Sequence, residues 1–457
     1  MKKILATLVM SAALSPMASA IAADTTMTAQ PVAAAEITDS EIIEKLFKGS
    51  YKFWQQARND NGSYEDKLYF EHGSNRGSIA NSGMGLIALA IGHEMGWEPD
   101  AEELALVTLR MLAGKGPDIS VPRNPSNTYI HFYDTRNGEQ IGVDWSPIDS
   151  AIMLCGALFI KRYFPENREI ATLVDELYET TDLTQFIADI NRGQIYLVQD
   201  DDGNNMPPKT KAFNEYMIVA ALANQQAIDF KKGRQGRDAR RFWNHWYETP
   251  KNLPVSYYND IPVLSEGRTW FTSKFNFLFN HYLLNGFSAS EEYQQASANA
   301  ARADYSWFQS QGFEGMKEFE WGSGAGSCPD GYCVDRIVHE GIETKNPHMM
   351  ISPTIIAGFI PHSERAKDDL IAMYRDDSQK AVYELPEGGT VLWRYSKTQP
   401  EWRSNAIEGV DFSTMLFGLA SLPEYLGTEF FNAYNDYSNP EPANYTRPSK
   451  VKLIAAE

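Results

Sequence analysis

Six segments of the chain are apolar on nearly every face of a helix, with glycine, alanine and serine mixed among the large residues. A helix without a polar face must be covered by protein on all sides, so these helices belong inside one large structure. They begin at intervals of roughly 60 to 80 residues, as repeated helical hairpins do. The six segments are residues 78–91, 147–159, 213–222, 275–284, 352–359 and 410–419.

Amphipathic, charge-rich segments of helical length lie between them, at residues 100–112, 167–178, 290–308, 364–374 and 423–434. Six buried helices and about six surface helices predict an all-α fold, the (α/α)6 toroid, in which six helical hairpins surround one cavity. A linear helical solenoid is the alternative. The long connections 118–146 and 310–350 favour the toroid, because loops of this length build the rim of a cleft.

The N-terminus has the pattern of a secretory signal peptide. Two lysines precede the apolar run 4–14, which is too short to span a bilayer, and Ala18-Ser19-Ala20 offers a cleavage site. A retained membrane anchor is the alternative, but no stop-transfer pattern follows. We therefore expect a signal peptide over residues 1–23, a disordered leader over 24–36 and a single domain over 37–457, located in the periplasm or secreted.

Charge and cysteine usage narrow the function classes. The net charge of −19 disfavours nucleic acid as a partner, because such a surface repels phosphate. Cys328 and Cys333 bracket a tight turn and predict a local disulfide in an oxidising compartment. Cys155 lies in an apolar run and is expected to be a buried free thiol. No zinc-binding spacing occurs, so no metal site is expected.

Three acids, Asp149, Glu215 and Asp411, interrupt apolar segments near their starts, and each is expected in the first turn of a buried helix. Burial of a lone carboxylate is costly, so each needs a compensating role. Glu215 has bulky apolar neighbours, which would raise its pKa as a general acid requires; the helix dipole would instead lower it. Asp149 and Asp411 could each be a helix-start acid or a carboxylate that acts on a sugar.

Aromatic side chains in the connecting segments form a second candidate set. Their faces suit sugar rings, although filling the outer core explains such residues equally well. They are Tyr129, Phe132, Tyr133 and Trp145 before the Asp149 segment, and Trp270, Trp321 and Trp393 elsewhere. Two further expectations concern His281, read as a core histidine, and residues 243–247, read as a folded loop.

Five stretches together resemble the glycoamylase-like family, and within it the endo-β-1,2-glucanases of glycoside hydrolase family 144. They follow the family's order over most of the chain, whereas the Cys328–Cys333 segment departs from its pattern. The stretches are SIANSGMGL at 78–86 with GHEMGW at 92–97; residues 145–156 with KRYF at 161–164; FNEYM at 213–217; EWG at 320–322; and residues 409–419.

The resemblance implies an (α/α)6 fold and hydrolysis of a neutral oligo- or polysaccharide with inversion and without a cofactor. It implies that Glu215 is the general acid, Asp411 the candidate base and Asp149 an acidic subsite residue. Expected substrate contacts are Phe132, Tyr133, Asp144, Trp145, Glu320, Trp321 and Trp393. A polysaccharide lyase on a similar toroid and a non-catalytic glycan-binding protein are the alternatives, and the oligomeric state stays open.

Overall fold

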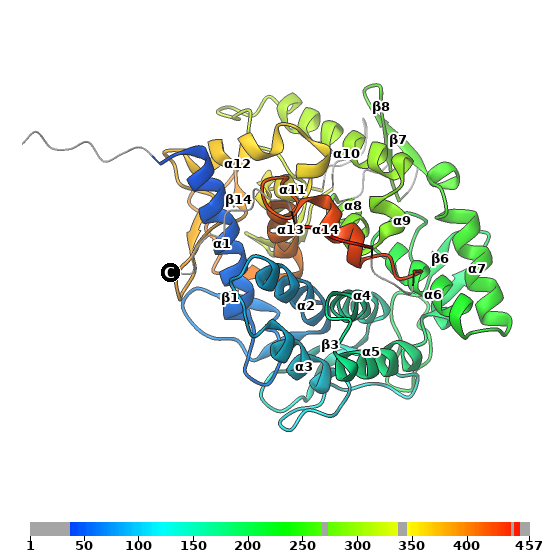
Figure 1. Cartoon of the computed structure of the whole chain (residues 1–457). Helices are drawn as coiled ribbons and strands as arrows, with labels where there is room; N and C mark the ends of the chain where they lie inside the picture. The colour runs from blue at the N-terminus through cyan, green and yellow to red at the C-terminus, as the bar shows by residue number, and fades with distance from the viewer. Residues whose placement is uncertain (1–36, 267–272, 337–344, 440–442, 448–457) are drawn as a thin grey trace, which may run out of the picture. The chain divides into compact units, whose positions relative to one another are not determined.

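The computed structural model describes residues 37–266, 273–336, 345–439 and 443–447, and these ranges contain fourteen α-helices and fifteen short strands (Figure 1). The predicted signal peptide and leader, residues 1–36, lie outside the described residues. The tertiary contacts of Asp39–Glu457 group into one unit. Within the described ranges, no helix combines the length and apolarity that a membrane crossing needs.

All six apolar segments of the sequence contain helices, which confirms the helical prediction. Each of these helices contacts the next along the chain, and the last contacts the first, so the contacts form a closed cycle. In this order the helices are α2 (Ile79–Glu94), α4 (Pro147–Tyr163), α6 (Met217–Asp229), α8 (Phe275–Leu283), α11 (Pro353–Gly358) and α13 (Gly409–Ala420).

The small residues of these helices permit very close backbone packing. A Cβ added to Gly156 of α4 would lie 2.0 Å from the carbonyl oxygen of Gly83 in α2. One added to Gly418 of α13 would lie 2.0 Å from the carbonyl oxygen of Ala357 in α11. Real Cβ atoms do not approach this closely, so glycine at these positions is a packing requirement of the buried helices.

Six further helices pack against the buried set, each through an apolar face. Helix α1 contacts α13 and α2; α3 contacts α2; α5 contacts α4; α7 contacts α6; α10 contacts α8; and α12 contacts α11. Two more, α9 (Asn285–Ser288) and α14 (Gly427–Tyr434), contact each other. The six are α1 (Asp39–Ala57), α3 (Ala101–Leu112), α5 (Arg168–Thr180), α7 (Arg234–Trp246), α10 (Glu291–Ser310) and α12 (Ala366–Tyr374).

Two of these helices differ from the expectation. Residues 243–247 are not a loop, because α7 continues through Trp246. The arginine-rich sequence of α7 has little apolar periodicity from which a helix could be predicted, because only Gly236, Ala239 and Phe242 of its residues are buried. Helix α1 was not predicted at all, although Ile42, Leu46, Phe53 and other residues of one face are buried.

Short antiparallel strands, which the sequence pattern did not reveal, lead directly into several buried helices. Strand β2 (Arg76–Ser78) ends immediately before α2, and it pairs with β3 (Ile130–Asp134), which pairs with β4 (Gln140–Trp145). Strand β4 ends just before α4. Strand β15 (Ala406–Glu408), paired with β1 (Lys67–Tyr69), ends immediately before α13. These strands fix where the N-terminal ends of α2, α4 and α13 lie.

The remaining strands form four isolated hairpins or pairs and a fifth pair that joins distant segments. They are β5 (Ile187–Asp189) with β6 (Gln194–Ile195), β7 (Val255–Tyr258) with β8 (Ile261–Leu264), β9 (Ala325–Cys328) with β10 (Gly331–Val334), β12 (Val382–Glu384) with β13 (Thr390–Leu392), and β11 (Met350–Ile351) with β14 (Tyr395–Ser396).

Candidate functional site

Asp411 occupies the first turn of α13, as the sequence predicted, and only 5% of its surface is exposed. Burial and the nearby Glu408 carboxylate raise the pKa of Asp411 to about 7. The Tyr332 hydroxyl donates a hydrogen bond of 3.0 Å to Oδ2 of Asp411, and this bond lowers the pKa of Asp411. A carboxyl group with this pKa can accept or release a proton near neutral pH.

Glu408, three residues before Asp411, is buried and fully engaged. Its Oε1 accepts hydrogen bonds from Nζ of Lys67 at 2.8 Å and Oγ of Ser327 at 2.6 Å, and its Oε2 accepts one from the Ser327 amide at 3.0 Å. These contacts join β1, β9 and β15 at the start of α13. Glu408 therefore holds these three segments together at the start of α13.

Glu215 lies two residues before α6 and not within its first turn, which corrects the sequence expectation. Asn214 sets this geometry: its Oδ1 accepts the Tyr216 amide at 3.0 Å, the side chain-to-backbone bond of an Asx turn. Asn280 of α8 then donates to the Asn214 carbonyl at 3.3 Å. The turn and the neighbouring buried helix thus hold the backbone that carries Glu215.

Glu215 is partly exposed as a residue, and its carboxyl group lies in an environment that favours the protonated form. Burial raises its pKa to about 7, and the carboxylates of Glu266 and Asp149 act in the same direction. Arg336, which lies 3.8 Å from Glu266, lowers it. A carboxyl group that keeps its proton near neutrality fits the requirement for a general acid.

Asp149, in the first turn of α4, lies beside strand β3. Its amide donates to Oγ of Ser146, the N-cap residue, at 3.2 Å. Nε2 of His131 lies 3.6 Å from its Oδ1. The His131 ring stacks on Phe132, with 3.6 Å between the ring centroids.

These residues are electrostatic neighbours in series. The Asp149 carboxylate raises the pKa of Glu215, and Asp149 lies beside His131. His131 lowers the pKa of Asp66, and Asp66 raises the pKa of Asp411. The three acids that the sequence singled out therefore belong to one connected group of charges. Two members of that group, Glu215 and Asp411, have a pKa of about 7.

Two of the predicted substrate contacts lie beside this group with accessible surface. Phe132 is partly exposed, and the Arg76 guanidinium carbon lies 3.5 Å from its ring centroid. Asp144 is exposed on β4 and is close enough to raise the pKa of Tyr216, which adjoins Glu215. Both are available to a ligand at the acids.

The other predicted contacts are buried, which corrects the expectation that they face a sugar. Tyr133, Trp321 and Trp393 have no exposed surface, and Trp145 is 4% exposed and donates from Nε1 to Asp201 at 2.8 Å. These aromatic rings fill the core, which was the alternative reading of the sequence. Trp270 lies outside the described residues.

Glu320 is 3% exposed and its carboxylate is saturated by protein donors. The donors are the Lys317 amide at 2.7 Å, the Tyr395 hydroxyl at 2.9 Å and Nζ of Lys397 at 2.7 Å. A carboxylate with this many internal partners holds loops together. It does not have the accessible oxygen that a sugar hydroxyl requires.

Sequence reasoning missed His131, Asp66, Lys67 and Tyr332, and did not separate Glu408 from Asp411. His131 sits inside the aromatic run 129–133, where its polar side chain was the available signal. Lys67 and Asp66 gave no such signal, because they reach the site through the pairing of β1 with β15, whose partner residues are 337 or more positions apart. Tyr332 was hidden in the turn between the two cysteines.

Other predictions concern residues away from the acids. The predicted disulfide joins Cys328 to Cys333, and Cys155 is free and buried. His281 is a buried histidine whose Nδ1 lies 3.2 Å from Nε2 of His362, as expected of a core residue with a partner. In the described ranges, no three His, Cys, Asp or Glu side chains form a group that could hold a metal ion.

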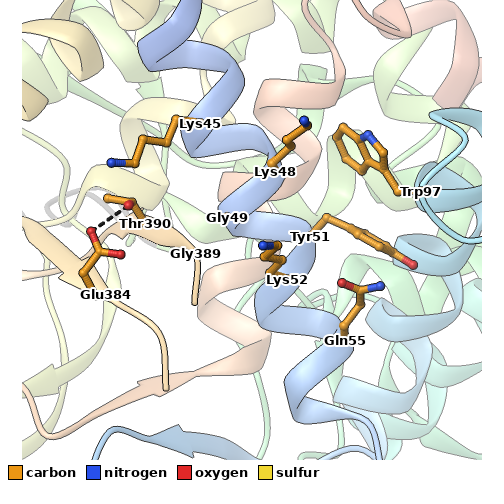
Figure 2. Close-up of a pocket in the computed structure, with 10 residues that line it drawn as sticks. All are labelled: Lys45, Lys48, Gly49, Tyr51, Lys52, Gln55, Trp97, Glu384, Gly389 and Thr390. Carbon is orange, nitrogen blue, oxygen red and sulfur yellow. Dashed lines mark hydrogen bonds between the residues drawn. The ribbon is translucent and has the colours of Figure 1, made fainter. Parts of the chain in front are cut away.

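A cavity of about 550 Å³ lies apart from the acids, between α1 and the β12–β13 hairpin (Figure 2). Lys45, Lys48 and Lys52 line it, together with Tyr51 and Trp97. None of Glu215, Asp149 and Asp411 contributes to its wall. The candidate site is therefore defined by its carboxyl groups and not by this cavity.

No protein-family model and no curated protein sequence matches the chain. Solved structures do match. An endo-β-1,2-glucanase from Chitinophaga pinensis, in complex with sophorotriose and glucose, superposes with a TM-score of 0.69 at 14% identity, over 87% of this chain and 95% of that one.

A β-1,2-glucanase from Parabacteroides distasonis gives a TM-score of 0.68 at 16% identity, over 88% of this chain and 59% of that one. An endo-β-1,2-glucanase from Talaromyces funiculosus, in complex with sophorose, gives 0.59 at 11% identity, over 88% and 87%. This chain thus has the fold of solved endo-β-1,2-glucanases.

Proposed function

We propose that this protein is a glycoside hydrolase that cleaves β-1,2-glucan internally with inversion of the anomeric carbon. One observation carries the proposal: on a glucanase fold, Glu215 and Asp411 adjoin the starts of two buried helices and both have a pKa of about 7. Because one fold can host several chemistries, these carboxyl groups and not the fold alone support hydrolysis.

Glu215 acts as the general acid. Its protonated carboxyl donates a proton to the glycosidic oxygen as the bond from that oxygen to the anomeric carbon breaks. Asp411, in its ionised form, accepts a proton from the water that attacks the opposite face of the sugar. The electron pair of the broken bond stays on the leaving oxygen, and each carboxyl group then returns to its starting state by proton exchange with solvent.

Asp149, His131, Phe132 and Asp144 form the substrate-binding surface beside the acid. Asp149 and His131 supply hydrogen-bonding groups for sugar hydroxyls. Phe132, whose ring faces contact Arg76 and His131, supplies apolar contact at the exposed edge of its ring. A neutral glucan suits a chain of net charge −19, because it brings no phosphate or carboxylate to be repelled. Neither metal nor organic cofactor takes part in the proposed reaction.

The architecture that we propose is the (α/α)6 toroid over residues 37–457. The closed cycle of contacts through α2, α4, α6, α8, α11 and α13 supports it, as does the set of six helices packed against them. In a toroid the starts of alternate helices surround one cavity, which explains how Glu215 and Asp411, 196 positions apart, reach one substrate. Export to the periplasm or the medium, proposed from residues 1–23, gives access to such a glucan.

Purified protein incubated with β-1,2-, β-1,3-, β-1,4- and α-linked glucans tests the proposal. We expect sophoro-oligosaccharides of several lengths from β-1,2-glucan alone, released with the α-anomeric configuration as seen by NMR. Release of an unsaturated product that absorbs in the ultraviolet would identify a lyase instead. Binding of glucan without turnover would identify a glycan-binding protein.

A further inference from the structure

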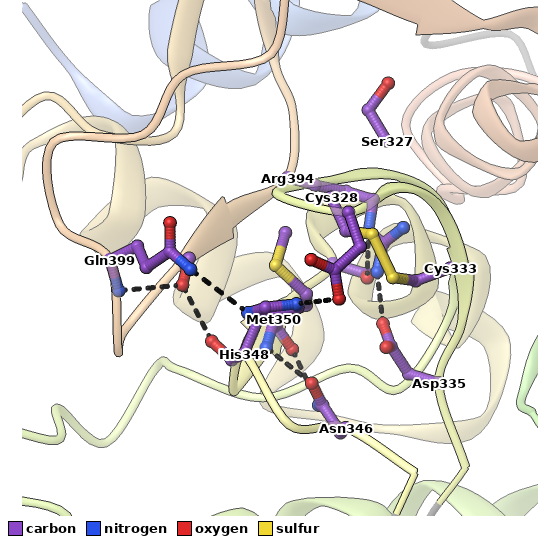
Figure 3. The surroundings of a disulfide bond; sticks show 12 residues. Ser327, Cys328, Cys333, Asp335, Asn346, His348, Met350, Arg394 and Gln399 are labelled. Carbon is purple, nitrogen blue, oxygen red and sulfur yellow. Dashed lines mark hydrogen bonds and ion pairs between the residues drawn. A yellow bond between two sulfur atoms is a disulfide. The ribbon is translucent and has the colours of Figure 1, made fainter.

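The β9–β10 hairpin is closed at its tip by the Cys328–Cys333 disulfide (Figure 3). Its two strands pair in register from Gly331 with Cys328 to Val334 with Ala325. The covalent link and the backbone pairing together leave this short segment few alternative conformations. Side chains on the hairpin are therefore presented at fixed positions.

Both strands of the hairpin contact the segment that carries Asp411. From β9, Ser327 donates to Glu408 through its amide and its hydroxyl. From β10, the Tyr332 hydroxyl donates to Oδ2 of Asp411 at 3.0 Å. The hairpin thus binds the last residue of β15 and the first turn of α13 at the same time.

The hairpin is also anchored at its base and at its turn. At the base, Asp335 forms an ion pair with Arg394; both side chains are essentially unexposed, and the Asp335 amide donates to the Gly324 carbonyl at 2.8 Å. At the turn, Nε2 of His348 lies 2.7 Å from Oδ2 of Asp330. The buried pair is costly to break, because either charge would be left without a partner.

Tyr332 combines two properties that a purely structural residue does not need. Its side chain is 51% exposed, whereas the Asp411 carboxyl that it contacts is buried. Its ring also lies under the Lys67 ammonium, 5.9 Å from the ring centroid. The tyrosine therefore stands between solvent and the carboxyl group, on the accessible side of that group.

We propose that Tyr332 is a positioning residue for Asp411, and that the disulfide-closed hairpin exists to hold its hydroxyl against that carboxylate. This inference rests on the proposed function, with Asp411 as the base. The phenol donates to Oδ2, so Oδ1 is the oxygen that takes the proton from water. Donation to the charged form also keeps the carboxylate ionised in a buried position.

The charged and hydrogen-bonding groups around Asp411 have opposite effects on its pKa. Glu408 and Asp66 disfavour its ionised form, whereas the Tyr332 hydroxyl and the Arg394 guanidinium favour it. Lys67 faces Tyr332 and Glu408. Arg394 pairs with Asp335 through Nη2, and the hydrogen bond from the hairpin to Asp411 comes from the Tyr332 hydroxyl.

The Tyr332→Phe variant removes the hydroxyl and keeps the exposed ring, so it should fold. Loss of the bond raises the pKa of Asp411, and a base must be ionised to act. We expect the acidic limb of the kcat/KM profile on β-1,2-glucan to move up by about one pH unit, and kcat at pH 6 to fall about tenfold. Tyr257→Phe, at a tyrosine that is 55% exposed on β7, is the matched control and should leave the profile unchanged.

The double variant Cys328→Ser/Cys333→Ser tests the role of the hairpin. We expect the same direction of shift with a smaller drop in kcat, because the hairpin keeps its hydrogen bonds and loses only its covalent closure. Unchanged activity in this variant would overturn the role of the disulfide. A Tyr332→Phe profile that superposes on the wild type would overturn the positioning role.

Failure of this inference is distinguishable from failure of the proposed function. Wild-type protein without turnover on β-1,2-glucan, or full activity of Asp411→Asn, would reject the proposed reaction or base. An active wild type, an inactive Asp411→Asn and an unshifted Tyr332→Phe profile would reject only the inference.

Discussion

Nε2 of His131 lies 3.6 Å from Oδ1 of Asp149, and this pair joins strand β3 to the first turn of α4. Asp149 is 8% exposed, while a third of the His131 side chain remains accessible. The histidine therefore stands between solvent and a buried carboxylate that is an electrostatic neighbour of Glu215. This arrangement suits a subsite that binds sugar hydroxyls.

Replacement of His131 by alanine tests that subsite. The substitution removes one hydrogen-bonding group and part of the stacking on Phe132, which together are expected to weaken substrate binding by about 1–2 kcal/mol. We expect KM for β-1,2-glucan to rise about tenfold with a much smaller change in kcat. His245→Ala, at an exposed histidine of α7, is the control. A drop in kcat with unchanged KM would assign His131 to the chemical step instead.

Glu215→Gln tests the general acid. Glutamine keeps the shape of the protonated carboxyl but has no proton to transfer, so kcat on β-1,2-glucan should fall about a thousandfold. Binding of sophoro-oligosaccharides, measured by calorimetry, should persist. Glu248→Gln, at an exposed glutamate that follows α7, should have wild-type activity. Undiminished turnover by the Glu215 variant would remove this residue from the mechanism.

The same variant should change how stability depends on pH. The pKa of Glu215 is about 7 in the folded protein and 4.5 as its ordinary value, so the folded state binds this proton more tightly. Stability is therefore lost as pH rises from about 4.5 to about 7, and is not recovered above that range.

Because glutamine has no such proton to lose, Glu215→Gln should be more stable than the wild type at pH 8 by about 1–3 kcal/mol and nearly equal to it at pH 4. Denaturant unfolding at the two pH values measures the difference. A variant that is less stable than the wild type at pH 8 would contradict the raised pKa.

Glu320→Gln separates a structural acid from a substrate contact. Glutamine loses the ion pair with Lys397 and one acceptor oxygen, so the free energy of unfolding should fall by about 2–4 kcal/mol. Activity per folded molecule should remain close to the wild type. Weakened oligosaccharide binding in a variant of unchanged stability would restore Glu320 as a substrate residue.

Gly156→Ala tests the close packing of α2 against α4. The added methyl would collide with the Gly83 carbonyl, so the helices must separate, at a cost of about 2–3 kcal/mol in the free energy of unfolding. Gly286→Ala in α9 is the control, since its nearest neighbour would be 3.7 Å away at Trp243. Thermal unfolding compares the two, and equal melting temperatures would contradict the packing argument.

The six buried helices were predictable because each is a local pattern: a helix that is apolar on all sides can be recognised from its own residues. Asp149, Glu215 and Asp411 could be singled out for the same reason, because an acid interrupts such an apolar pattern. The disulfide was predictable because its two cysteines bracket one short turn.

Other features were decided only by the tertiary structure. Burial of Trp321, Trp393 and Glu320 depends on neighbours far along the chain, so an aromatic or an acid in a connecting segment could not be assigned to the core or to a sugar. Tyr332 meets Asp411 across 79 positions, on a hairpin with no apolar periodicity. Periodicity records which face of an element is buried, but not which distant side chain lies against it, and at this site the protonation of Asp411 depends on that neighbour.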